Sequence, residues 1–455
     1  MKFKFNSRIS RGTVGLRGTG ALAVLAASVL ITSVPARAQS APEQAAPRQL
    51  SLVDCVTLAL GRNVEVLSAA DDTSIAEAQR SGARGQFGPK FQLDASLQYW
   101  NEPYAFDGFP IHARTVWNMT ATATQPVTAL FAIYDAYKVR DLGVDIAAVR
   151  HEMARRETAF RVVERYYRLL QAKRLEEVSI ASVDELEAQL RQANAFHESG
   201  TVSRDDVLRA ELALANARER LIQVRSRVTL ERASLAALIG LSPDSPIDAQ
   251  PVYDELPTPE AISLEQAEKT AELQRIELRE VDKQIESMAH ETRLAYLKLI
   301  PSVNVVGAYI HNEGSLLSDI NAGYVGATAS WDVWDWGTTA SGISEAKARE
   351  HQAHLARSKV DDRVRLEVQQ AFIGVHSARE AMAVAKASVA LAEENFRLVQ
   401  RRYDASAATS FDVVDAEGLL TQARGQMQTA LYDFFITRAA LRTAEGAPPE
   451  SLLNR

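Results

Sequence analysis

The 455-residue sequence predicts a mainly α-helical fold with a small β part, in which a long helical hairpin and a β-hairpin each occur twice. Three observations predict it. Blocks of sequence recur at a fixed offset, which indicates a tandem duplication. Proline is absent from 127–242 and from 302–447, so both stretches can form helices far longer than usual. Short segments that alternate apolar and polar residues precede each stretch, as in β-strands.

Residues 1–38 have the features of a secretory signal peptide. Basic residues precede an apolar run at 21–34, and Ala36-Arg37-Ala38 supplies a cleavage site of small residues. The run is too short to span a bilayer comfortably, so a retained membrane anchor is the weaker alternative. No cysteine follows the site, so a lipid-anchored N-terminus is not expected.

Without this segment the chain is acidic. It keeps 45 basic residues against 58 acidic ones, a formal net charge of −13. This balance disfavours nucleic acid as a partner. Cys55 is the only cysteine, so no disulfide can form within one chain. Stability must therefore come from packing and assembly.

The duplication is visible at two offsets. Pro89 matches Pro301, 212 positions later, whereas Asp206–Glu211 matches Asp412–Glu417, 206 positions later. The first copy therefore carries six extra residues, which we expect in the polar loop at 102–112. Five prolines between 243 and 259 rule out a regular helix where the copies join. The predicted organisation is a signal peptide 1–38, a first repeat 39–240, a Pro-rich linker 241–262, a second repeat 263–447 and a C-terminal tail 448–455.

Each copy is predicted to begin with one helix, at about 52–82 and 264–299, and to end with a long helix, a turn and a returning helix. Residues 133–196 are rich in good helix formers and would span about 95 Å. In the second copy apolar residues recur at spacings of three and four, which predicts a coiled-coil seam. On the helices alone, an ordinary antiparallel coiled coil remains an alternative. The seam residues are Met382, Ala385, Val389, Ala392, Phe396, Val399 and Tyr403.

The predicted strands alternate strictly. Apolar residues occupy the odd positions from Phe91 to Tyr99 and from Trp117 to Ala123, with polar residues between them. Such a pattern places one face in an apolar medium and the other in water, and ten residues suit a membrane β-strand. The second copy shows a weaker form at 303–309 and 325–331. A half-buried sheet in a soluble sandwich is the alternative.

Four strands cannot close into a barrel, and an open sheet edge in a bilayer leaves backbone groups unsatisfied. If the strands insert, the chain must therefore oligomerise, and a homotrimer would supply a 12-stranded outer-membrane β-barrel continued by a periplasmic α-helical barrel. Trp331, Trp334 and Trp336 stand where strand gives way to helix. They fit an interfacial aromatic belt, or alternatively core packing.

Motifs for catalysis are missing from the sequence. It contains no GxSxG, no GxxxxGK[ST] and no CxxC. His351 and His354 share a helix face but have no third ligand in view. We therefore expect no enzymatic activity, no cofactor and no metal site.

Two similar strings end the predicted long helices, Phe196–Leu208 and Arg402–Glu417. With the duplication, the strand pairs and the proline-free helices, they make the chain resemble the outer-membrane efflux protein family, the TolC-like channels. The resemblance implies a passive export channel in the outer membrane, with most of the chain in the periplasm. It would serve a tripartite efflux or type I secretion system and carry small molecules or secreted proteins. The implied partners are two further copies, a periplasmic adaptor protein, an inner-membrane pump or transporter, and outer-membrane lipid.

The same resemblance implies functional positions at the two helix tips. Tyr403 and Asp206 fall at positions of bonds that close the channel, and Asp412 and Asp415 at lumen-facing acidic positions that would favour cations. The alternative for these carboxylates is a solvated helix start. The tips would also dock the adaptor. The docking residues are Gly200, Thr201, Ser203, Ser406, Ala407 and Ser410.

Local chemistry gives further expectations for these turns. Gly200 can adopt a positive φ to end its helix, and Ser203 and Ser410 are expected to cap the returning helices. Ser406 stands where the family often has glycine, which predicts a wider second turn. Two alternatives to the channel are a soluble periplasmic adaptor and a structural coiled-coil protein of the envelope. The first predicts no membrane strands, and the second leaves the paired strands unexplained.

Overall fold

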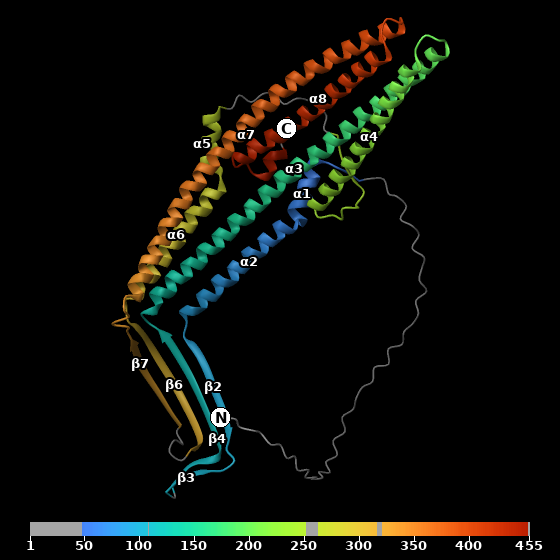
Figure 1. Cartoon of the computed structure of the whole chain (residues 1–455). Helices are drawn as coiled ribbons and strands as arrows, with labels where there is room; N and C mark the ends of the chain where they lie inside the picture. Colours follow the sequence, from blue (N-terminus) through green and yellow to red (C-terminus); the bar gives the residue numbers. More distant parts are fainter. Residues whose placement is uncertain (1–47, 108, 252–262, 316–320, 454–455) are drawn as a thin grey trace, which may run out of the picture. The chain divides into compact units, whose positions relative to one another are not determined.

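A computed structural model describes residues 48–107, 109–251, 263–315 and 321–453 (Figure 1). The predicted signal peptide and residues 252–262 of the predicted linker lie outside this part of the chain. The structure confirms a mainly helical fold with a small sheet. None of the described helices is both long and apolar enough to cross a membrane.

The helices follow the same order in both copies. The first copy contains α1 (Leu52–Arg62), α2 (Val64–Arg84), α3 (Ala129–Glu198) and α4 (Arg204–Leu238). The second copy contains α5 (Leu264–Gln274), α6 (Ile276–Leu297), α7 (Thr338–Asp404) and α8 (Ser410–Ala444). Short 3₁₀ helices follow α2 and α8, η1 (Gly85–Phe87) and η2 (Pro449–Leu453). With 70 and 67 residues, α3 and α7 confirm the predicted long helices.

The single leading helix predicted for each copy is wrong, because each is broken into two. Asn63 and Arg275 stand at the breaks with extended backbone, ψ 130° and 118°. Asn63 caps α2 by accepting from the Glu65 N–H, and its amide donates to the Leu238 carbonyl at 2.9 Å. This second bond ties the break to the end of α4. The break at Asn63 therefore combines a local helix cap with a tertiary contact.

The main sheet is antiparallel, in the order β2 (Lys90–Tyr99), β4 (Phe109–Pro126), β6 (Ser302–Ser315) and β7 (Asn321–Ser330). A short strand β3 (Tyr104–Phe106) also pairs with β4. Strands β2 and β7 each have one unpaired edge within the described residues, and every residue of both strands is exposed. No second layer covers the sheet among the described residues, so the soluble-sandwich alternative is wrong.

The strand pairs locate the six extra residues of the first copy. Tyr99 pairs with Thr115, and its counterpart His311 pairs with Asn321. Residues 100–114 lie between the first pair and 312–320 between the second, so the first loop is six residues longer. This confirms the predicted place of the insertion.

A core cluster gathers where the two copies join. β1 (Arg48–Leu50) pairs in parallel with β5 (Ile247–Ala249), so the predicted linker contains a strand. The Tyr166 hydroxyl donates to the Gln250 carbonyl at 2.8 Å, and the Tyr166 side chain is 1 % exposed. This packing joins α3 to both ends of the first repeat and stabilises the fold by burying apolar surface.

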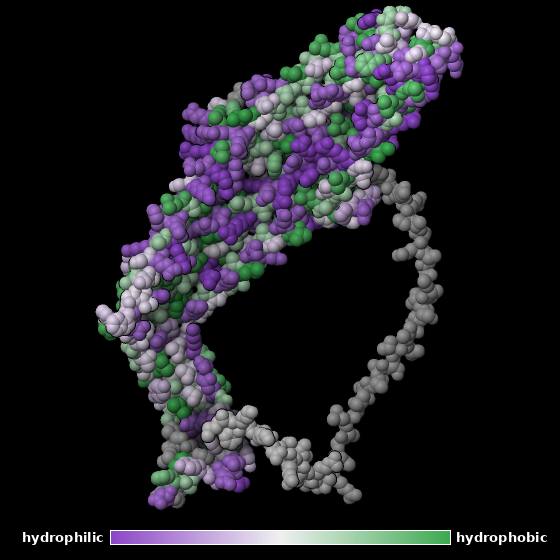
Figure 2. All heavy atoms as spheres, viewed as in Figure 1, coloured by the Kyte–Doolittle hydropathy of each residue, from purple (hydrophilic) through white to green (hydrophobic). Residues whose placement is uncertain are grey.

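The helices pack as hairpins. α3 lies along α4, and α7 along α8, while α2 and α6 pack on α3 and α7 respectively (Figure 1). The hairpins meet because α3 also packs along α8. All seven predicted seam residues of α7 are buried or half-buried, which confirms the seam. On the face shown in Figure 2 most of the helical surface is hydrophilic, with scattered apolar side chains.

Candidate functional site

The two hairpin tips have the same backbone. The turns span 199–203 and 405–409, five residues each. Gly200 and Ser406 both adopt a left-handed conformation, with φ 79° and 57°. The Thr201 N–H donates to the Phe196 carbonyl, and the Ala407 N–H to the Arg402 carbonyl, at 2.8 and 2.7 Å. Both are Schellman caps, so the expected widening at Ser406 is wrong. Serine adopts the conformation that glycine adopts more easily.

Each returning helix begins with a capping box. Ser203 and Thr409 accept the N–H of Asp206 and Asp412, whose carboxylates accept in return. Ser203 is therefore the cap that was predicted, whereas the predicted cap Ser410 is wrong. Thr409 caps α8, and Ser410 is its first residue, with 0 % exposure. Thr409 and Ser410 are both residues that can cap a helix. The five-residue turn places Thr409 at the cap, as it places Ser203 in the first hairpin.

The carboxylates Asp412 and Asp415 are both exposed, one turn apart on α8. The backbone N–H and the hydroxyl of Thr409 hold the pKa of Asp412 below its ordinary value. Asp412 therefore remains ionised in mildly acidic solution. Its role at the lumen, like that of Asp415, stays a prediction.

Tyr403 lies between the two tips. Its side chain is 1 % exposed, and its ring centroid is 5.5 Å from that of Phe196. Burial raises the pKa of Tyr403, and the Asp206 carboxylate raises it further. The structure thus brings together the two residues predicted to close the channel, although they meet within one chain. Their closing role stays a prediction.

Polar bonds tie the tips together close to Tyr403. The Gln192 amide donates to Asp404 Oδ1 at 2.8 Å, and the Gln400 amide donates to Gln192 and Asp404, both at 3.2 Å. Phe196 and Asp404 belong to the two tip strings, but the sequence analysis gave them no role, and it did not name Gln192. These contacts could not be predicted, because the approach of α3 to α7 is not visible in the sequence.

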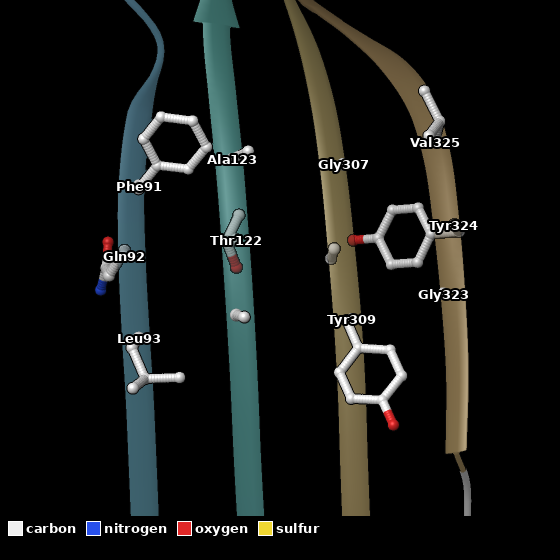
Figure 3. A pocket seen from close by; sticks show the side chains of 12 residues that line it. Phe91, Gln92, Leu93, Thr122, Ala123, Gly307, Tyr309, Gly323, Tyr324 and Val325 are labelled. Atoms are coloured by element: carbon white, nitrogen blue, oxygen red, sulfur yellow. The ribbon is translucent and has the colours of Figure 1, made fainter.

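One face of the main sheet is apolar. In register, Phe91 pairs with Ala123, which pairs with Gly307, which pairs with Val325. Figure 3 shows Phe91 and Leu93 beside small residues of the central strands. A hollow of about 740 Å³ lies over these residues, and the Phe91 side chain is 80 % exposed. Exposed apolar residues that gather on one face mark a surface made for an apolar environment.

Three tryptophans follow this sheet between β7 and α7. Trp331, Trp334 and Trp336 are 57, 75 and 88 % exposed, so core packing is wrong as their explanation. Asp335 accepts the hydroxyl and the N–H of Thr339 and the N–H of Gly337 at the start of α7, and these bonds lower the pKa of Asp335. The tryptophans therefore stand on a fixed turn where the sheet ends. Exposed indoles at such a boundary are typical of a membrane interface.

Comparison with known proteins agrees with this arrangement. A family model described as "Outer membrane efflux protein" matches residues 55–241 and 269–447. The outer membrane efflux protein BepC of Brucella suis is 23 % identical over 331 residues, 69 % of this chain and 70 % of BepC. The crystal structure of the Campylobacter jejuni CmeC outer membrane channel is similar with a TM-score of 0.78 and 18 % identity, covering 87 % of this chain and 85 % of CmeC.

The outer membrane protein VceC of Vibrio cholerae has a similar structure, with a TM-score of 0.75 and 16 % identity. This likeness covers 87 % of this chain and 96 % of VceC. At such identities the structural likenesses show the fold. The family model matches twice, once in each predicted repeat.

Proposed function

Because the chain belongs to the outer membrane efflux protein family, we propose that three copies form a passive duct through which cargo leaves the periplasm. The protein is an efflux channel of the outer membrane, and its family is one of transport proteins rather than enzymes. In this proposal the duct catalyses no reaction. Energy and cargo come from an inner-membrane pump through a periplasmic adaptor protein, and the cargo is a small molecule or a secreted protein.

The single observation that supports the duct is the sheet with two unpaired edges. Strands β2 and β7 lack a neighbour on one side within the described residues, and the exposed apolar face needs an apolar medium. In a bilayer, unpaired backbone groups cost several kcal/mol each, on the order of the values for buried polar groups. Pairing β7 of one copy with β2 of the next satisfies them. Three copies then give a closed barrel of twelve strands.

The helices supply a second seam for assembly. Within one chain α3 packs on α8. If the repeats continue around a ring, the equivalent contact is between α7 of one copy and α4 of the next. Both helices carry a stripe of exposed apolar residues there. The stripes are Leu355, Leu366, Ile373, Val384, Leu391 and Leu398 on α7, and Leu208, Leu212, Ile222 and Leu230 on α4.

The tips are the proposed entrance. Asp206 and Tyr403 would hold it closed, and Asp412 and Asp415 would form rings of charge in the trimer that attract cations. The exposed turn residues Gly200, Thr201, Ser203, Ser406 and Ala407 would meet the adaptor, whereas Ser410 is buried in the single chain. The predicted repeats 39–240 and 263–447 would be the two halves of each subunit.

Planar-bilayer conductance of the detergent-extracted protein tests this proposal. The wild type should give small, stable, cation-preferring conductance. The double variant Asp412→Asn plus Asp415→Asn removes two charges while it keeps the hydrogen-bonding capacity of the capping box, and it should lose the preference. Asp205→Asn, at an exposed acidic residue outside the proposed constriction, is the control and should keep it.

Two other outcomes are informative. Unchanged selectivity in the double variant would keep the duct but place the constriction elsewhere. Failure of the folded wild type to insert, or its recovery without detergent, would overturn the duct and favour a soluble adaptor.

A further inference from the structure

A cavity of about 220 Å³ lies between the two helical hairpins, next to the tips. Gln192 and Gln400, which tie the tips together, line it, and so does Val413, the neighbour of Asp412 on α8. Helices α3, α7 and α8 form its walls. Its polar lining includes Glu185, Gln189 and Glu417, and its apolar lining includes Leu186 and Phe396. No basic residue lines it.

Glu417 is a buried carboxylate without a cation. It is 3 % exposed, and the hydroxyls of Ser182 and Thr421 both donate to its Oε1, at 2.5 and 2.7 Å. Within the described chain no Lys, Arg or His forms a salt bridge with it at 4.0 Å or less. Charged side chains are almost never fully buried unless paired, so this position calls for a counter-charge.

Two further polar groups of the cavity lining are unsatisfied. Gln189 is 5 % exposed, and its Nε2 has no hydrogen-bond partner among the described residues. Glu185 accepts from Arg424 at Oε1 over 3.1 Å, while its Oε2 has no partner. The Gln189 amide can present its oxygen instead of its nitrogen, because the two orientations are nearly isosteric. The lining then offers three oxygen acceptors to a single donor-rich ligand.

We propose that this cavity binds a free small organic cation, a guanidinium or alkylammonium compound. Glu417 supplies the counter-charge, Glu185 and Gln189 accept N–H groups, and Leu186 and Phe396 cover the carbon atoms of the ligand. The volume of the cavity suits such a ligand. Its 220 Å³ equals the volume of about seven water molecules in the liquid, which is enough for a cation with a short alkyl chain. No group of three His, Cys, Asp or Glu side chains in the described residues could hold a metal ion instead. The site lies within one chain and does not require the proposed trimer.

The repeat supplies a matched control. Glu211 stands 206 positions before Glu417 and is its counterpart on α4, but its side chain is 46 % exposed and lies near Arg204, at 4.0 Å. Glu417 and Glu211 therefore share a sequence context and differ in burial. Only Glu417 should bind a cation.

Isothermal titration of the detergent-solubilised full-length protein with n-butylguanidinium tests the site, and n-butylurea serves as the neutral isostere. The wild type should bind the cation and not the urea. Since hydrogen bonds to a charged group contribute about 1.5 to 3 kcal/mol, Glu417→Gln should bind at least about tenfold more weakly. Glu211→Gln should bind as the wild type does.

A second variant keeps every charge. Ala188 is an exposed residue of the cavity lining, so Ala188→Leu should narrow the cavity and weaken binding even if Glu417→Gln fails to fold. Equal binding of butylurea, equal affinity in Glu417→Gln or Ala188→Leu, or no binding by the wild type would overturn the site. An acetylated Gly-Arg-Gly peptide that binds more tightly than butylguanidinium would overturn the assignment to a free molecule and favour an arginine of a partner protein.

Discussion

The two hairpin tips share a backbone but differ in what covers them. Tyr403, Ser410 and Glu417 of the second hairpin are 1, 0 and 3 % exposed. Their counterparts in the first hairpin, His197, Arg204 and Glu211, are exposed.

The cause of the difference is the neighbouring hairpin. α3 of the first hairpin packs against α8 of the second, whereas α4 lacks an equivalent cover in a single chain. Duplicated sequences thus acquire different chemistry from what packs on them. In the proposed trimer, the uncovered α4 is the surface that a second chain would cover. The following changes compare the two tips.

Truncation of the aromatic side chain between the tips should have the largest effect. Tyr403→Ala removes a ring that is 1 % exposed, and large-to-small changes at such sites cost about 3 to 5 kcal/mol of unfolding free energy. His197→Ala at the exposed counterpart should cost less than about 0.5 kcal/mol. Thermal unfolding in detergent, with the protein kept monomeric, measures both. Equal losses would mean that the two tips are covered alike.

Exchanging glycine and serine at the left-handed turn residue should change the unfolding free energy in opposite directions in the two tips. Gly200→Ser forces a side chain into a conformation that costs about 1 to 2 kcal/mol, so the unfolding free energy should fall. Ser406→Gly relieves the same strain and should raise it by at most about 1 kcal/mol, because the unfolded chain also gains freedom. Denaturant unfolding of each variant gives the sign. Destabilisation by Ser406→Gly would show that the serine is held by contacts that the turn geometry does not reveal.

Substitutions of the adjacent residues Thr409 and Ser410 test which of the two caps α8. Thr409→Ala removes the cap of α8 and should cost about 1 kcal/mol, as should Ser203→Ala in the first hairpin. Ser410→Ala should cost less than Thr409→Ala, because the Ser410 hydroxyl does not cap α8 and its polar neighbour is the Tyr403 hydroxyl. Melting temperatures of the three variants test this order. A larger loss from Ser410→Ala than from Thr409→Ala would contradict the assignment of the cap.

Removal of the Asp412 charge should have the smallest effect, a change in how the unfolding free energy falls at acidic pH. The pKa of Asp412 is lowered in the folded state, so its contribution is complete above the unfolded value of 3.8 and is lost as the pH falls through the lower folded value. Asp412→Asn should therefore lower the stability slightly at neutral pH and flatten the acid limb of the stability profile, so that the variant and the wild type converge as the pH falls through the folded pKa. Melting temperatures between about pH 2.5 and 6 measure it. An unchanged limb would mean that the Thr409 bonds do not favour the ionised carboxylate.

Much of the fold was predictable because the signals are long. Stretches free of proline, strict alternation in the strands and two matching offsets each extend over many residues, so a local error does not erase them. Even the six-residue insertion followed from the offsets alone. Gly200 and Ser203 were predictable because the turn requires a positive φ and the helix start requires a hydroxyl.

What was missed depends on contacts between distant segments. Asn63 interrupts an otherwise helical pattern because its amide reaches Leu238, and Gly240 approaches so closely that a Cβ there would lie 2.7 Å from Arg62 Cβ. The cavity around Glu417 exists only because α3 lies on α8. In the sequence, Glu417 and Glu211 look alike. The sequence therefore predicts the helices, strands and turns. Tertiary packing determines which of the two similar residues, Glu417 or Glu211, is buried and lines the proposed ligand site.

The unequal hairpin loops have a practical consequence for protein engineering. The six additional residues lie between Tyr99 and Thr115 and leave the pairing of β2 with β4 in the same register as that of β6 with β7. This position therefore accommodates additional residues without a change in strand register. An epitope inserted at 101–103, before the short strand β3, should be displayed while the pairing of β2 with β4 is kept. In the proposed threefold assembly, an antibody would meet it three times, each time next to the shorter loop.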